Sequence, residues 1–314
     1  MVGYKPGLVN LSPAEVALAG SVSGFVTRAV VSPLDLLKIR FQLQVENITR
    51  HGASGKYQGL VQAVRTVWAE EGLSAFWKGH VPAQLLSVSF GCVQFVAFEV
   101  LTELAYKRLQ YDTSSPGLHF TCGGMAACAA TLTCQPLDML RTRFASQGEP
   151  RVYHGLRHAV SKIYHHDGML GFYRGLAPTL VAVFPYAGMQ FSLYTFFTQL
   201  YKALRTSPHS NEGVMQSVLC GALAGMISKT LTYPFDLIKK RLQVQSFHEA
   251  RSHFGQVKEY RGAIHCALCI AAEEGQSGLF KGLTPSLLKA AVATGLTFST
   301  YELTCRFMRT IKGN

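Results

Sequence analysis

Long apolar stretches separated by polar segments follow one another along this chain. Each stretch exceeds the roughly 20 helical residues that are needed to cross about 30 Å of hydrocarbon. The six stretches cover residues 14–45, 82–107, 118–146, 178–204, 214–245 and 285–309. This pattern predicts an all-α membrane protein with six transmembrane helices. A soluble helical array is the alternative, and it is disfavoured because its helices would be too few and too long.

A short amphipathic helix is predicted between the two apolar stretches of each pair. In the first pair, Val61, Val64, Val67 and Trp68 recur at helical spacing on one face of residues 60–70. Two crossings return the chain to its starting side, so all three pairs share one orientation. Parallel repeats of this kind surround an axis along the membrane normal in known transporters.

Three motifs recur in each third of the chain. The first, Pro-x-Asp-x-x-Lys/Arg, begins at Pro33, Pro136 and Pro234. An aromatic-x-Gly motif and an acid-Gly to aromatic-basic-Gly motif follow, at residues 57–59 and 71–79, 153–155 and 167–175, and 260–262 and 274–282. The tyrosine precedes the acid by 14 residues in all three copies. The register predicts tandem repeats at residues 12–110, 115–204 and 213–310, forming a pseudo-threefold barrel around a central cavity.

Composition and charge narrow the function. Hydrophobic residues make up 48% of the chain and charged residues only 15%, below the roughly 25% charged content of soluble domains. The formal net charge is +12. Because the basic residues are spread along the chain and form no basic run, an anionic membrane or an anionic substrate is favoured over nucleic acid.

The eight cysteines predict no metal centre, since the C-x-x-C of Cys266 and Cys269 has no second pair and no His at ligand spacing. We expect them to be reduced and buried. The first ten residues contain neither a long apolar segment nor an Arg-rich amphipathic one, so no cleavable targeting segment is expected.

Ionised side chains within the first apolar stretch of each repeat predict a gate. The acid and the base of Pro-x-Asp-x-x-Lys/Arg lie on one helical face, and charges within a membrane are costly unless paired or wet. Threefold symmetry allows each acid to reach the base of the next repeat, closing a ring of ion pairs at one end of the bundle. The alternative is pairing within each helix, with a purely static role.

Residues that break the threefold symmetry predict the substrate site. Five residues before the motif prolines lie Arg28, Thr131 and Lys229, and four residues after the later prolines lie Leu86, Ala182 and Lys289. We expect the cations Arg28, Lys229 and Lys289 to face one cavity, with no acid at equivalent depth. Such a site favours a substrate with two or more negative charges, such as a phosphorylated compound.

Nearby aromatic and amide side chains could hold a ring with polar edges. The candidates are Phe90, Tyr186, Gln94 and Gln190. For the two aromatic residues, packing against lipid or protein is the alternative interpretation.

The three motifs, repeated over nearly the whole chain, resemble those of the mitochondrial carrier family. The resemblance implies a multi-pass transporter of the mitochondrial inner membrane, without enzymatic activity. It also implies a matrix-side gate made of the pairs Asp35–Arg141, Asp138–Lys239 and Asp236–Lys38. Gln42 and Gln243 would brace this gate, whereas Ala145 in the second repeat would not.

The resemblance further implies bound cardiolipin, with no cofactor besides this lipid. Helix N-termini would present free N–H groups to its phosphates. The candidate residues are Gly59, Gly79, Gly155, Gly175, Gly262 and Gly282.

The opposite gate departs from the family pattern, which expects an aromatic-acid-x-x-base motif on the second helix of each repeat. Glu99 and Glu302 are present, but Thr102, Thr198 and Cys305 occupy the three basic positions. We therefore expect a weak cytoplasmic-side gate.

Within the family, residues 76–84, 184–188 and 228–234 resemble carriers of thiamine pyrophosphate. This implies uptake of that compound into the matrix in exchange for nucleotides, by a monomer. The cation set would equally suit adenine nucleotides, deoxynucleotides or CoA. An enzyme is disfavoured because no G-x-S-x-G motif, Walker loop or metal cluster occurs. A channel that leaks protons or anions, and a scaffold without a cavity, would not require three asymmetric cations.

Overall fold

The computed structural model describes residues 12–46, 55–109, 116–204, 212–245, 247 and 258–312. Six long helices span these ranges: α1 (Pro13–Leu43), α3 (His80–Leu109), α4 (Pro116–Ser146), α6 (Leu176–Leu204), α7 (Glu212–Val244) and α9 (Leu283–Lys312). Three short helices lie between them: α2 (Leu60–Glu71), α5 (Leu156–Gly171) and α8 (Ala263–Glu273). The 3₁₀ turns η1 (Leu73–Trp77) and η3 (Gln276–Phe280) complete the regular structure of these ranges. The prediction of six long helices with three short ones is confirmed.

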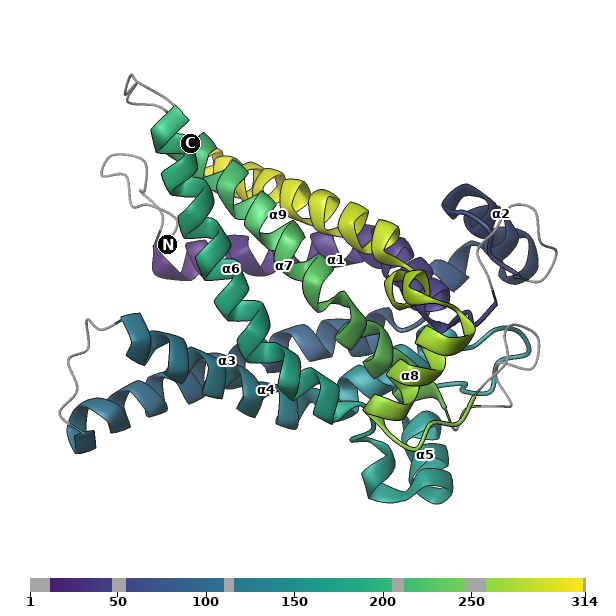
Figure 1. Ribbon diagram of the computed structural model, residues 1–314. Coiled ribbons are helices and arrows are strands. Elements are labelled where there is room, and N and C mark those ends of the chain that lie inside the picture. The colour runs from purple at the N-terminus through teal and green to yellow at the C-terminus, as the bar shows by residue number, and fades with distance from the viewer. Residues whose placement is uncertain are drawn as a thin grey trace.

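The long helices form a bundle in which neighbouring repeats pack side by side. Helix α3 packs against α4, α6 against α7, and α9 against α1. Figure 1 shows both chain ends at one end of the bundle, which we call the terminal end. Helices α2, α5 and α8 lie at the opposite, short-helix end. The contact between α9 and α1 joins the last repeat to the first and closes the ring of repeats.

The long helices of the bundle differ in how apolar they are. Segments Glu15–Leu43, Leu73–Lys107 and Leu176–Ala203 are long and apolar enough to cross a membrane by length and composition alone. Helices α4, α7 and α9 are more polar. Their exposed side chains still include Leu132 and Phe298. A helix that lines a polar interior needs only an apolar stripe toward lipid.

Helix starts and interiors follow from local sequence. Ser12 caps α1 in a capping box with Glu15, and satisfies backbone N–H groups that have no partner within the helix. The motif prolines Pro33, Pro136 and Pro234 lie inside α1, α4 and α7, which continue across them. Each proline removes one hydrogen bond from its helix.

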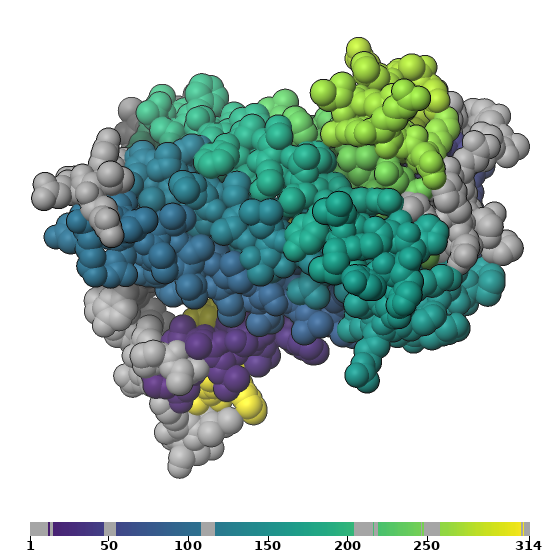
Figure 2. Space-filling view, turned by 90° about the horizontal axis from the view of Figure 1, so that it is seen from below, coloured from purple at the N-terminus to yellow at the C-terminus, as the bar shows by residue number. Residues whose placement is uncertain are grey.

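The best-packed region is at the short-helix end. Leu36, Tyr57 and Val67 of the first repeat join one buried cluster with Tyr153 of the second and Phe247 of the third. Toward the terminal end the bundle opens, and Figure 2 shows a hollow between α1 (purple) and α3 (blue), with α9 visible behind it. The structure is therefore closed at the short-helix end and open at the terminal end.

Candidate functional site

The three predicted ion pairs between repeats are present near the short-helix end. Asp35 of α1 pairs with Arg141 of α4 at 2.7 Å. Asp138 of α4 pairs with Lys239 of α7 at 3.0 Å, and Asp236 of α7 pairs with Lys38 of α1 at 3.3 Å. Because each acid reaches the base of the next repeat, these pairs form a closed ring, and the alternative of pairing within each helix does not describe this structure.

A second cation contacts each acid of the ring. Lys289 forms an ion pair with Asp35. Lys229 lies 3.5 Å from Asp236 on its own helix. The expectation that no acid lies at the depth of these lysines is therefore wrong. The reason is geometric, because Lys229 precedes Asp236 by seven residues, which is two helical turns on the same face.

The two glutamines expected to brace the ring differ. Gln243 donates from Nε2 to the Asp138 carboxylate at 2.8 Å, as expected of a brace. Gln42 is fully buried, but its side-chain amide makes no hydrogen bond of good geometry in the described part of the chain. Of the two, only Gln243 braces an acid of the ring.

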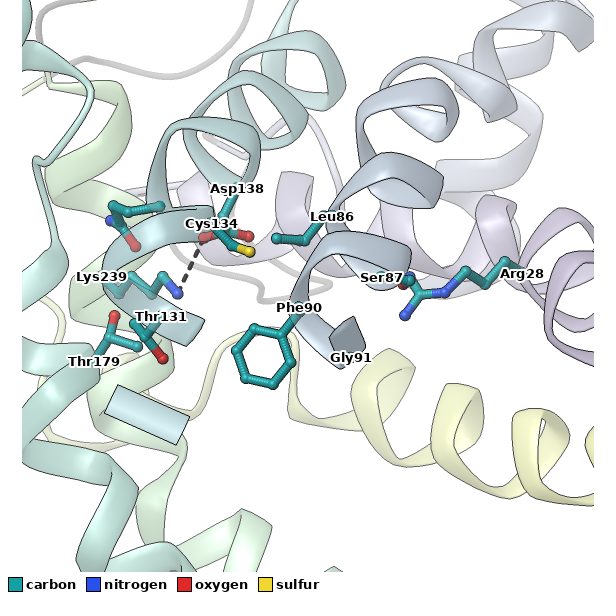
Figure 3. A pocket seen from close by; sticks show the side chains of 11 residues that line it. Arg28, Leu86, Ser87, Phe90, Gly91, Thr131, Cys134, Asp138, Thr179 and Lys239 are labelled. Atoms are coloured by element: carbon teal, nitrogen blue, oxygen red, sulfur yellow. Dashed lines mark ion pairs between the residues drawn. The ribbon is translucent and has the colours of Figure 1, made fainter. Parts of the chain in front are cut away.

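A cavity of about 400 Å³ includes the Asp138–Lys239 pair in its wall (Figure 3). Its volume lies within the range of small-molecule sites. Its lining comes from five of the six long helices: Arg28, Leu86, Ser87, Phe90, Gly91, Thr131, Cys134, Gln135, Asp138, Thr179 and Lys239. In Figure 3 the Phe90 ring lies between Lys239 on one side and Arg28 on the other. The cavity can therefore offer an aromatic face and two cations to one ligand.

Several predicted substrate residues lie outside this lining. Lys229 and Lys289 are held at the ring by Asp236 and Asp35. Gln94, Gln190 and Tyr186 are also not among the lining residues. They lie further along α3 and α6 than the residues of these helices that line the cavity, toward the open terminal end, so their role in binding stays a prediction.

Arg28 links the cavity to the ring. It lines the cavity and also a narrow crevice that contains Asp35 and Arg141. Its guanidinium donates to the Ala83 carbonyl at 3.4 Å. Arg28 is thus the one cation of the predicted set that lines the larger cavity within the described residues.

Sequence reasoning missed a second set of ion pairs, which lies behind the ring. Arg40 makes a bidentate pair with Glu71, Arg143 pairs with Asp167 at 2.5 Å, and Arg241 pairs with Glu274. Each arginine also donates to a carbonyl of the next repeat, at Ala145, Gln243 and Gln42 respectively. The signal was available, since a base follows the ring base by two residues in all three copies, and the acid belongs to the repeated acid-Gly motif.

Glu71 shows how strongly these pairs are held. Burial disfavours the charged carboxylate, but hydrogen bonds from Arg40 and from Lys78, at 2.6 Å, outweigh it and hold the Glu71 pKa below its usual value. Lys281 at the equivalent of Lys78 pairs with Glu274, and burial lowers its pKa. The Glu71 carboxylate therefore remains ionised under physiological conditions.

The six glycines expected at lipid sites fall into two groups. Gly59, Gly155 and Gly262 immediately precede α2, α5 and α8, where a side chain would meet open space. Gly79, Gly175 and Gly282 have φ of 85°, 79° and 82° and precede the next long helix. A Cβ at Gly175 would lie 2.8 Å from the Lys239 carbonyl oxygen. Packing therefore explains the glycines of the second group, because a residue without a side chain lets the short-helix end approach the ring closely.

The terminal end carries no equivalent ring among the described residues. Glu302 pairs with Arg306 of its own helix at 2.5 Å. No ion pair of Glu99 occurs in the part of the chain that the structure describes. Sequence reasoning missed Arg306, because it sought the base three residues after the acid and not four.

Comparison with known proteins agrees with this architecture. The family model described as mitochondrial carrier protein matches residues 9–109, 112–204 and 210–312. The chain belongs to this family, and it is a multi-pass protein of the mitochondrial inner membrane.

Individual relatives narrow the comparison. The mitochondrial thiamine pyrophosphate carrier of Homo sapiens is 57% identical over 97% of this chain and 96% of its own. The mitochondrial thiamine diphosphate carrier 2 of Zea mays is 40% identical over 96% and 95%. The mitochondrial thiamine pyrophosphate carrier 1 of Aspergillus oryzae is 36% identical over 95% and 94%.

Proposed function

We propose that this protein moves thiamine pyrophosphate across the mitochondrial inner membrane into the matrix, in exchange for nucleotides. The observation that carries the proposal is that an animal, a plant and a fungal relative, matched over nearly their full lengths, are all named for this cargo. The 400 Å³ cavity supports it, since Arg28 and Lys239 are suited to a diphosphate and Phe90 to an aromatic ring.

The transport cycle needs no covalent step, so the protein is a carrier and not an enzyme. Substrate enters from the open terminal end and binds near the ring. To open the short-helix end, the three ion pairs between repeats must separate. A substrate drives this change only if it binds the rearranged state more tightly than the state seen here. Arg28, Lys229 and Lys289 are the groups proposed to supply that difference.

The protein acts as a monomer in this proposal, because one chain closes the ring of repeats and encloses the cavity. Cardiolipin is the proposed lipid partner. Gly59, Gly155 and Gly262 support it, since each leaves the N-terminus of a short helix uncovered by a side chain.

Reconstitution in liposomes tests the cargo. Liposomes containing the full chain and loaded with a nucleotide should take up labelled thiamine pyrophosphate, and empty liposomes should not. Uptake of ADP, a deoxynucleotide or CoA in preference to thiamine pyrophosphate would favour the rival nucleotide or cofactor carrier. Uptake without an internal nucleotide would contradict exchange.

A further inference from the structure

The Asp138 corner of the ring is built differently from the other two. At Asp35 and Asp236 the second cation is Lys289 or Lys229, both proposed substrate ligands. In the second repeat, the position equivalent to Lys229 is Thr131, which carries no charge. The second cation at this corner is Lys240, which lies next to Lys239 on α7.

Lys240 is held entirely by protein groups. Its ammonium lies 3.1 Å from both carboxylate oxygens of Asp138. It also donates to the Thr142 hydroxyl at 2.7 Å and to the Gln243 side-chain oxygen at 3.0 Å. The equivalent positions in the other repeats are Ile39 and Thr142, so this lysine belongs to the third repeat alone. Lys240 is absent from the cavity lining, whereas Lys239 is part of it.

Each ring acid thus has two cations, and at Asp35 and Asp236 the two differ in exposure. At Asp35, the side chain of Lys289 is 29% exposed and that of Arg141 16%. At Asp236, the values are 32% for Lys229 and 14% for Lys38. At Asp138, the side chains of Lys239 and Lys240 are similarly shielded, at 15% and 11%, but only Lys239 lines the cavity. Each ring acid therefore keeps a cationic partner when one of its two cations leaves.

We infer that Lys239 is a phosphate ligand of the transported substrate, and that Lys240 makes this possible by retaining Asp138. If Lys240 were absent, moving Lys239 to a ligand would strand a buried carboxylate, which is costly. With Lys240 present, the corner has two cations for one acid, and an anion in the cavity balances the excess. Lys239 lies across the Phe90 ring from Arg28, so both can contact one diphosphate-bearing ligand (Figure 3).

This inference rests on the proposed transport of a phosphorylated anion, but it can be tested by binding alone. The probe is inorganic pyrophosphate, and the readout is its effect on the melting temperature of the purified full chain. Lys239→Gln should weaken pyrophosphate binding roughly ten-fold or more. Lys202→Gln, at an exposed site in the last turn of α6, removes the same charge and should leave binding unchanged.

A double variant tests the role of Lys240 separately from that of Lys239. Lys240→Gln should also weaken binding, because Asp138 then holds Lys239. Adding Asp138→Asn to Lys240→Gln removes the acid and should restore the affinity. A merely structural Lys240 would give no rescue, and that result would overturn its assigned role.

A measurement on the unmutated chain covers the case in which a variant fails to fold. Acetylation of Lys239, followed by mass spectrometry, should slow when pyrophosphate is present, while Lys202 should react at the same rate. Equal acetylation of Lys239 with and without pyrophosphate, or unchanged affinity in Lys239→Gln, would overturn the inference. So would a chain that does not bind pyrophosphate. If Lys239-dependent binding is found but thiamine pyrophosphate is not transported, the proposed cargo fails and the inference stands.

Discussion

In the proposed mechanism, a lysine near the ring pairs with a ring acid and also binds the substrate. This sharing couples substrate binding to opening of the ring. Lys289 comes from α9 and pairs with Asp35, although Arg141 already contacts that acid. A lysine shared between an acid and a future ligand can respond to substrate without leaving the acid unpaired. The residues that bind cargo and the residues that close the ring therefore form one network.

Replacing Lys289 should reduce transport without destabilising the fold. We expect Lys289→Gln to lower thiamine pyrophosphate uptake by at least roughly ten-fold, because a charge-assisted contact to phosphate is lost. The melting temperature should change little, since Arg141 still pairs with Asp35. Liposome uptake and thermal unfolding measure the two effects, with Lys202→Gln as the control. Full uptake in the Lys289 variant would contradict its assignment.

Two glycines of one repeat should respond differently to the same substitution. Gly175→Ala places a Cβ 2.8 Å from the Lys239 carbonyl at a φ of 79°, so it should destabilise the protein by about 2–4 kcal/mol. Gly155→Ala adds a side chain in open space at an extended φ of −174°, and should change stability little. Thermal unfolding of both variants provides the comparison, and equal losses would mean that close approach to the ring is not the cause.

At the scale of elements, each short helix is tied to a long helix through a buried acid. Glu71 ends α2 and pairs with Arg40 of α1, whose guanidinium also reaches the carbonyls of Ala145 and Gln147 in the second repeat. The cationic side chain thus occupies the C-terminal end of α4, where helical carbonyls have no partner within the helix. One ion pair joins a short helix, its own long helix and the next repeat.

Removing Glu71 should destabilise the protein far more than removing its neighbour Glu70. Glu71→Gln removes the carboxylate that pairs with buried Arg40 and leaves Lys78 with Glu149 as its acidic partner. It should lower the free energy of unfolding by about 2–4 kcal/mol. Glu70 pairs with Lys56 at a half-exposed site, with its side chain 48% accessible, so Glu70→Gln should cost less than about 1 kcal/mol. Thermal unfolding at pH 7 measures both, and similar losses would contradict the argument.

The same acid should also give a pH dependence. The Glu71 pKa lies below its usual 4.5 in the folded protein. Its stabilising contribution is therefore complete above pH 4.5 and is lost as the pH falls through the lowered folded value. The stability difference between the unmutated chain and Glu71→Gln should narrow below pH 4.5. A difference that stays constant there would show that Glu71 acts by packing alone.

For the whole molecule, the two ends of the bundle are unequally equipped to close. The short-helix end has the ring of three ion pairs and the larger buried cluster. At the terminal end, Glu302 is bonded within its own helix. Because few attractive groups are available there among the described residues, the state open at the short-helix end should be weakly populated without substrate.

Supplying the missing bases should shift this balance. We expect Thr102→Lys with Thr198→Lys to give Glu302 and Glu99 cationic partners, and so to stabilise closure of the terminal end. A Ser87→Cys reporter on the cavity wall should then react more slowly with a membrane-impermeant thiol reagent added from the terminal end. The glutamine versions of both substitutions are the control. Unchanged labelling in the lysine variant would mean that this end closes without ion pairs.

The sequence by itself determined the architecture and the ring. Six long apolar stretches fix the crossings, since the hydrocarbon thickness sets a minimum helix length. Threefold repetition predicts equivalent partners for Asp35, Asp138 and Asp236, and the resemblance to the carrier family implies that these partners come from the next repeat. The buried arginine pairs were also encoded, in the base that follows the ring base by two residues and in the acid-Gly pair.

Only the tertiary structure decided which cations share an acid and which face the cavity. Lys229 and Lys289 were predicted from broken symmetry, but their contacts with Asp236 and Asp35 depend on how far each side chain reaches across the bundle. Lys239 and Lys240 are neighbours in sequence, yet one lines the cavity and the other is enclosed by Asp138, Thr142 and Gln243. Sequence order cannot separate two adjacent lysines, because their environments are set by side chains that come from other helices.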